Sequence, residues 1–219
     1  MIAGNLLSQE IIPLRTSDTG QEALGVMNDF YVKHLPIVNN KQLLGLISED
    51  DILNYDVEEA VGSYQLSLNH PQVRENDHVY EVMRMLAEYQ LTVVPVVDIE
   101  GNYLGLVSQD DLLRFFANIG SFSEPGSIIV LEMSKQDYSL AELGRIVESE
   151  NAAILSSFIT SSLDSTQIDV TIKINRKDIS RVIATLVRFN YQVKASFQEA
   201  EYFDSLKERY DSLINYLNV

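Results

Sequence analysis

Residues 34–53 read HLPIVNNKQLLGLISEDDIL, and residues 93–113 read VVPVVDIEGNYLGLVSQDDLL. Four residues of the first stretch recur in the second: Pro36, Gly45, Ser48 and Asp51 as Pro95, Gly105, Ser108 and Asp111. The offset is 59 residues at the prolines and 60 at the glycines, so one residue is inserted where a tight turn between two strands is expected. A sequence repeat that continues through such a turn predicts a structural repeat.

Each repeat is predicted to follow the order strand, helix, two strands around a turn, helix. In the same register Leu14, in the short strand 11–14, matches Val73. A helix opened by Asp18 in one repeat and Asp77 in the other carries apolar residues every three or four positions, as a helix with one buried face does. One unit is too short to bury a good core, so the repeats, at about 2–58 and 64–118, are expected to pack together.

The composition is that of an ordinary globular protein. The chain has 219 residues, of which 46% are apolar, and no cysteine, which excludes a disulfide scaffold, a thiolate metal site and a cysteine nucleophile. The N-terminus does not resemble a secretory signal, and no apolar run approaches the roughly 18 residues of a membrane helix. We therefore expect a cytoplasmic protein.

The chain is strongly acidic. Its 16 basic and 32 acidic residues give a formal charge of −16, and no cluster of lysine or arginine interrupts this surplus. Binding to a phosphate backbone depends on basic patches that displace counterions. The sequence therefore predicts neither nucleic acid nor an anionic membrane as a partner.

The duplicated motif, hxP in a strand and GhhSxxDhh entering a helix, resembles the cystathionine β-synthase (CBS) domain pair over residues 1–118. The resemblance implies an α+β fold, in which two repeats form a disc-like module with two clefts that often hold AMP, ATP or S-adenosylmethionine. It also implies that the Ser of each motif meets phosphate and that the Asp meets ribose hydroxyls. These residues are Ser48 and Asp51 in one cleft, and Ser108 and Asp111 in the other.

The same four residues also fit a purely structural role. A Ser at a helix N-cap and an acidic residue three positions later form a variant of the capping box, so each pair could start a helix without any ligand. The candidate cations for a phosphate are Arg15, Arg74, Lys33 and His34. The second repeat has Thr92 and Val93 in place of Lys33 and His34, so the two clefts are expected to differ chemically. A single His beside a Pro in an apolar strand is more typical of packing than of catalysis.

After residue 118 the pattern changes. Residues 119–126 are predicted to be a linker, and residues 127–198 show the order strand, helix, two strands, helix, strand of a ferredoxin-like fold, with a turn at 163–165. This stretch resembles an ACT domain, a family that commonly binds amino acids near the loop after its first strand. Here that loop carries Asp137-Tyr138-Ser139 without Pro or Gly, so a dimerisation or docking domain without a ligand is an open alternative. Residues 199–219 are predicted to form an amphipathic helix.

No nucleophile elbow, phosphate-binding loop, paired catalytic carboxylates or metal motif is found, so we expect no enzyme, no catalytic or metal site and no obligatory cofactor. The layout resembles CBS–ACT regulators of the acetoin-utilisation type. We predict a homodimeric regulatory protein that senses an adenosine nucleotide or related metabolite and signals to a protein partner. A ligand-free dimeric scaffold and an amino-acid sensor acting through the ACT-like half remain alternatives.

Two helix faces are expected to be exposed and to form an interface between subunits. They follow the two motif carboxylates and comprise Ile52, Leu53 and Tyr55 in the first repeat, and Leu112, Leu113, Phe115 and Phe116 in the second.

Overall fold

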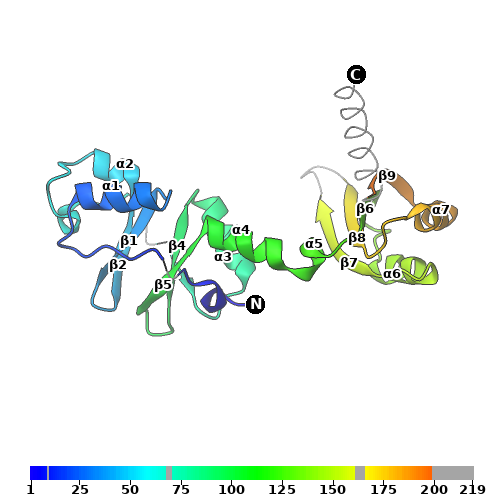
Figure 1. Ribbon diagram of the computed structural model, residues 1–219, viewed down its shortest axis with the longest axis horizontal. Coiled ribbons are helices and arrows are strands. Elements are labelled where there is room, and N and C mark those ends of the chain that lie inside the picture. The colour runs from blue at the N-terminus through cyan, green and yellow to red at the C-terminus, as the bar shows by residue number, and fades with distance from the viewer. Residues whose placement is uncertain (9, 68–70, 161–165, 199–219) are drawn as a thin grey trace, which may run out of the picture. The chain divides into compact units, whose positions relative to one another are not determined.

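The computed structural model describes residues 1–8, 10–67, 71–160 and 166–198. The chain divides into two compact units, Met1–Ala117 and Asn118–Val219, each of which is considered by itself (Figure 1). The turn expected at 163–165 and the helix expected at 199–219 lie outside the described residues.

The first unit contains the predicted repeat. Its elements are η1 (Ala3–Leu6), α1 (Gly20–Asp29), β1 (His34–Asn39), β2 (Gln42–Ser48), α2 (Glu49–Leu53), η2 (Val61–Ser63), β3 (Val73–Arg74), α3 (Val79–Glu88), β4 (Val93–Val97), β5 (Tyr103–Ser108) and α4 (Gln109–Asn118). Strands β1 and β2 form one antiparallel hairpin, and β4 and β5 form the other, with β3 parallel to β4. The short strand expected at 11–14 is reduced to a parallel bridge between Leu14 and Ile37.

The first helix of each repeat begins one residue later than the sequence suggests. Thr19 caps α1 and His78 caps α3, so the prediction that Asp18 and Asp77 open these helices is wrong. Each Asp instead accepts a hydrogen bond of 2.7 Å from the backbone amide three residues before it. An Asp side chain satisfies such a turn readily, which leaves the next residue to cap the helix.

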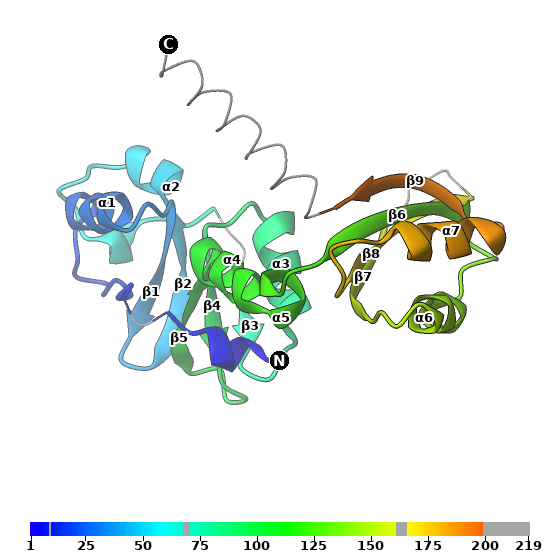
Figure 2. The ribbon, with the colours of Figure 1, turned by 45° about the vertical axis from the view of Figure 1, so that its right-hand side comes forward.

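The two repeats share one hydrophobic core, as their length requires. Leu35 and Leu46 of the first repeat and Val94 and Leu106 of the second are fully buried within it. The start of the chain packs on the second repeat, beside β3 and β5 (Figure 2). There the amides of Ala3, Gly4 and Ser8 donate to the carbonyls of Asp77, Glu75 and Leu106 at 2.8, 2.9 and 2.8 Å.

The second unit has the predicted ferredoxin-like fold. Its elements are α5 (Gly120–Ser123), β6 (Ser127–Ser134), α6 (Leu140–Ser149), β7 (Ile154–Thr160), β8 (Gln167–Ile174), α7 (Ser180–Arg188) and β9 (Gln192–Phe197). The strand order is β7-β8-β6-β9, with every neighbouring pair antiparallel. The alternating residues Ile168, Val170, Ile172 and Ile174 of β8 are buried in a core that includes Leu143 of α6 and Val182 of α7. The α+β class is thus confirmed for both units.

The segment 119–126, expected as a linker, contains the helical turn α5. The Phe122 and Phe158 ring centroids lie 5.8 Å apart, and Lys173 Nζ donates to the Phe122 carbonyl at 2.9 Å. These contacts hold α5 against β7 and β8 of the second unit. Among the described residues, no helix has both the length and the apolar character needed to cross a membrane.

Candidate functional site

The two Ser–Asp pairs of the duplicated motif lie at the starts of α2 and α4. The Asp51 amide donates to Ser48 Oγ at 3.0 Å, and the Ser48 amide donates to Asp51 Oδ2 at 3.0 Å. Ser108 and Asp111 repeat the exchange at 3.0 and 3.1 Å. Both pairs therefore form capping boxes, and the structural interpretation of these residues is confirmed.

The two motif carboxylates differ in their surroundings. Asp51 is only 5% exposed, and its second oxygen, Oδ1, accepts the Ser67 amide at 3.2 Å. Burial raises the pKa of Asp51, but hydrogen bonds from Ser48 and Ser67 outweigh it, so that the pKa lies below the ordinary value. Asp111 is half-buried, and its capping bonds from the amide and hydroxyl of Ser108 both fall on Oδ2. Both carboxylate oxygens of Asp51 therefore accept hydrogen bonds from backbone amides of the protein.

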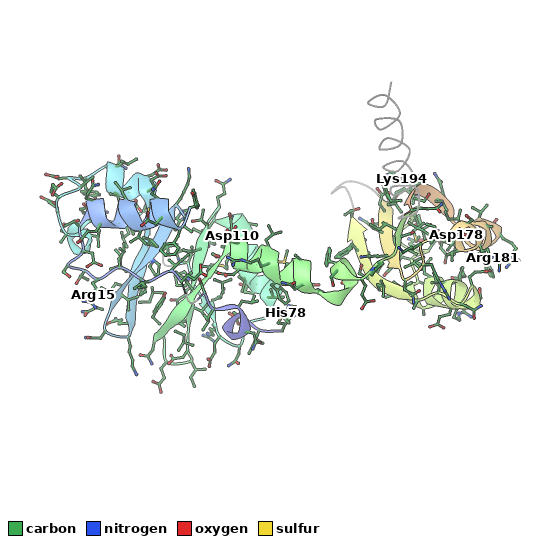
Figure 3. All side chains as sticks on the ribbon, viewed as in Figure 1. Arg15, His78, Asp110, Asp178, Arg181 and Lys194 are labelled. Carbon is green, nitrogen blue, oxygen red and sulfur yellow. The ribbon has the colours of Figure 1, made fainter. Side chains whose placement is uncertain are left out.

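A cavity of about 220 Å³ lies at the start of α4. Its walls come from Ser8, residues 10–11, residues 29–32 at the end of α1, Thr92, residues 108–110 and Arg114. Both repeats thus contribute to it, and Figure 3 shows Asp110 on α4. Ser108 therefore lines this cavity together with residues outside the motif, such as Tyr31 and Thr92.

The cavity is rich in negative charge. Glu10, Asp29 and Asp110 line it against one arginine, Arg114. Arg114 was not among the predicted cations, although it lies four residues after Asp110 and so on the same side of a helix. Three carboxylates beside one guanidinium favour ligands with little negative charge.

Two of the expected cations are not part of this site. Arg15 and Arg74 are both exposed, and neither is among the described residues that line the cavity at α4. Figure 3 shows Arg15 well separated from Asp110 within the first unit. Each arginine lies in a turn before the first helix of its repeat, where its backbone amide is bound by an Asp.

The other two, Lys33 and His34, line a smaller pocket of about 70 Å³ at the start of α2, together with residues 48–50. Lys33 Nζ lies 3.7 Å from Glu49 Oε2, and both side chains are substantially exposed. An exposed pair of this kind contributes little to stability. The two helix starts therefore carry pockets of different size and charge, as the sequence predicts.

His34 is held at the boundary between the repeats. The Thr92 amide donates to His34 Nδ1 at 3.2 Å, which assigns the ring proton of the neutral form to Nε2. Burial lowers the pKa of His34, and the opposing influence of Asp51 and Asp50 does not cancel this effect. A neutral, half-buried ring that accepts a backbone amide supports the packing role expected for this residue.

The second unit has a cavity of about 700 Å³ beside the loop between β6 and α6, where an ACT domain would bind its ligand. Glu132, Asp137 and Glu142 line it, and no lysine or arginine does so among the described residues. Burial and Glu142 raise the pKa of Tyr191 in the same wall. The carboxylate of a free amino acid would therefore meet like charge without a basic partner.

Comparisons with known proteins agree with the repeated fold. A protein-family model described as the CBS domain matches residues 3–58 and 65–118. The magnesium transporter MgtE of Thermus thermophilus is 31% identical over 117 residues, which cover 51% of this chain and 26% of the transporter. The uncharacterized protein MJ0188 of Methanocaldococcus jannaschii is 24% identical over 109 residues, covering 49% of this chain and 41% of that protein. The chain thus spans well under half of either curated relative.

Among solved structures, a CBS domain pair/ACT domain protein from Thermotoga maritima has 25% identity and a TM-score of 0.48, covering 53% of this chain and 96% of that one. CBSX2 in complex with AMP has 23% identity and a TM-score of 0.45, covering 54% of this chain and 97% of that one. The duplicated motif, the shared core and the match of the family model to both repeats place this chain in the CBS domain family.

Proposed function

We propose that this chain is a non-catalytic regulatory protein that binds an adenosine-containing metabolite in the cavity at the start of α4. The observation that carries the proposal is that this cavity joins the helix start at Ser108 to side chains from both repeats. A helix N-terminus favours a phosphate or another anionic group through its partial positive charge. A ligand that touches both repeats can also favour one arrangement of them over another, which is what regulation requires.

In this proposal the residues around the cavity have separate roles. Ser108 and Arg114 receive a phosphate. Asp111 follows the lining residue Asp110 without lining the cavity itself, and it exchanges part of its capping role for a ribose hydroxyl. Phe30 and Tyr31, at the end of α1, provide aromatic surface for a purine. The small volume and the three carboxylates favour adenosine or a monophosphate over a triphosphate.

Titration calorimetry tests this function. The purified, ligand-stripped protein is titrated with adenosine, AMP, ADP, ATP and S-adenosylmethionine, and the titrations are repeated on Asp111→Asn and Arg114→Gln. Arg74→Gln is the matched control, because Arg74 is an exposed arginine that does not line the cavity among the described residues. We expect saturable binding that weakens in Asp111→Asn and Arg114→Gln and is unchanged in the control.

The absence of heat from every compound, with a folded protein, would instead favour a ligand-free dimeric scaffold. Leu53 on α2 and Leu113 on α4 support a homodimer in either case, since they are 63% and 69% exposed at matching positions of the two repeats. A melting temperature raised by free amino acids, and by no adenosine compound, would point to the second unit as the sensor.

A further inference from the structure

The starts of α2 and α4 are joined by a short path of hydrogen bonds. The Glu49 amide, in the first turn of α2, donates to the Lys33 carbonyl at 2.9 Å. The Lys33 amide donates to Thr92 Oγ1 at 2.8 Å. The Gln109 amide, in the first turn of α4, donates to the Thr92 carbonyl at 3.0 Å. Two residues, one from each repeat, therefore connect the two helix starts.

The same residues face different pockets. Thr92 lines the cavity at α4, whereas Lys33 and His34 line the pocket at α2. Thr92 also contacts His34 twice, because its amide donates to Nδ1 and its hydroxyl lies 3.1 Å from that atom. A displacement of Thr92 would thus be transmitted directly to His34. Contiguous hydrogen bonds of this kind can carry coupling between two sites.

We propose that Thr92 couples the two helix starts, so that occupation of the cavity beside Ser108 changes the state of His34 and of the pocket at the start of α2. This inference rests on the proposed use of the cavity as a ligand site. The coupling is reciprocal, because any free-energy change that one site imposes on the other acts in both directions.

His34 provides a direct readout. The charged groups that face it are Asp51 and Asp50 from α2 and Lys33, which immediately precedes β1, and burial is the main cause of its lowered pKa. The Thr92 amide bonds only to an unprotonated Nδ1, so this bond favours the neutral ring. Weakening the bond raises the pKa of His34, and strengthening it lowers the pKa further.

The experiment is an NMR titration of the imidazole of His34 in the full chain, with and without saturating AMP. His34→Gln assigns the resonance among the three histidines of the chain. We expect AMP to move the midpoint by about one pH unit, which corresponds to about 1.4 kcal/mol and lies within the range of ordinary coupling energies. Thr92→Val removes the hydroxyl that accepts the Lys33 amide and touches Nδ1 but keeps the backbone amide, so the movement at saturating AMP should become smaller without vanishing. Thr92→Ser should restore the movement.

A ligand-free perturbation separates this inference from the nucleotide proposal. Ser108→Ala alters the start of α4 without AMP, and it should move the His34 midpoint in the wild-type background and move it less with Thr92→Val. If AMP binds and His34 does not respond in the wild type, the coupling is overturned while the nucleotide site stands. If AMP does not bind, a response to Ser108→Ala keeps the coupling and removes the nucleotide proposal. If AMP does not bind and His34 also does not respond to Ser108→Ala, both proposals are overturned.

Discussion

Asp51 Oδ1 accepts the backbone amide of Ser67 at 3.2 Å, a hydrogen bond that ties the start of α2 to the chain that leads into the second repeat. The other oxygen is used by the Ser48 amide. The carboxylate is therefore a structural junction in the first repeat. Asp51 should therefore contribute more to stability than Asp111, although the two motifs are nearly identical in sequence.

We expect Asp51→Asn to lower the free energy of unfolding by about 1–3 kcal/mol, because an amide group cannot replace both acceptor oxygens. The pKa of Asp51 in the folded chain is below its ordinary value of 3.8. Near that pH the folded chain therefore binds fewer protons than the unfolded chain, and its stability depends on pH. The stabilisation is complete above pH 3.8 and is lost as the pH falls through the folded pKa.

Urea denaturation between pH 7 and pH 3 measures the effect. The difference between wild type and Asp51→Asn should shrink toward the acidic end. Asp111→Asn, the same change in the second repeat, should lower the free energy of unfolding by a smaller amount. Equal losses in the two variants would contradict the assignment of Asp51 as the structural member of the pair.

The carboxylates of Glu10, Asp29 and Asp110 in the cavity at α4 predict that ligands with less negative charge bind more tightly. We expect Asp110→Asn to strengthen the binding of ATP by about threefold to tenfold and that of adenosine hardly at all, because it removes one like charge near the phosphates. Calorimetry at two salt concentrations measures both ligands, and added salt should reduce the difference. An equal gain for adenosine would show that charge is not the cause.

Tyr31 combines backbone strain with a position at the cavity. It has φ +54° and is 92% exposed, and Gln90 has φ +53° at the equivalent place after α3. Glycine relieves about 1 kcal/mol at a left-handed position. Tyr31→Gly and Gln90→Gly should therefore both leave the chain at least as stable in thermal unfolding. Only Tyr31→Gly should weaken nucleotide binding, and weakening by both would argue against direct contact.

The two exposed leucines test the homodimer. Leu113→Glu and Leu53→Glu place a charge on α4 and α2 without disturbing a core residue, since both side chains are mostly exposed. Light scattering after size-exclusion chromatography should show a shift from dimer to monomer for at least one of them. Arg84→Gln, on an exposed helix surface, is the control and should leave the mass unchanged. A dimer that persists in both leucine variants would place the interface elsewhere.

The repeated motif allowed the fold to be predicted well, because hydrophobic spacing and turns are local properties of the sequence. The capping roles of Ser48 and Ser108 were predictable for the same reason. The prediction of exposed helix faces was wrong at Ile52, which is fully buried because its helix turns that side chain into the shared core while Leu53 faces outward. On α4, Leu113 is exposed, but Leu112 packs partly buried against the core, and Phe115 and Phe116 are half-buried. A helix of five residues is too short for its spacing to reveal which face is buried.

The candidate site was less predictable, since it depends on contacts between distant segments. Arg15 and Arg74 lie close to the motifs in the expected order of elements, but their turns keep them outside the described lining of the cavity. Arg114 and Tyr31 reach the cavity from opposite repeats, and no local pattern links them. The bond between Thr92 and His34 joins positions 58 residues apart, and alignment of the repeats matches Thr92 to Lys33, so it gives no sign that Thr92 contacts His34.

The pairing of residues 3–8 with the second repeat bears on how the molecule is assembled on the ribosome. These residues are synthesised before the rest of the unit, whereas their hydrogen-bond partners at Glu75, Asp77 and Leu106 emerge only after the whole first repeat. The start of the chain must therefore wait for nearly the entire unit before it reaches its final place. In a nascent chain halted between the repeats, residues 3–8 would lack these hydrogen-bond partners. They therefore reach their final place only when the second repeat has been synthesised.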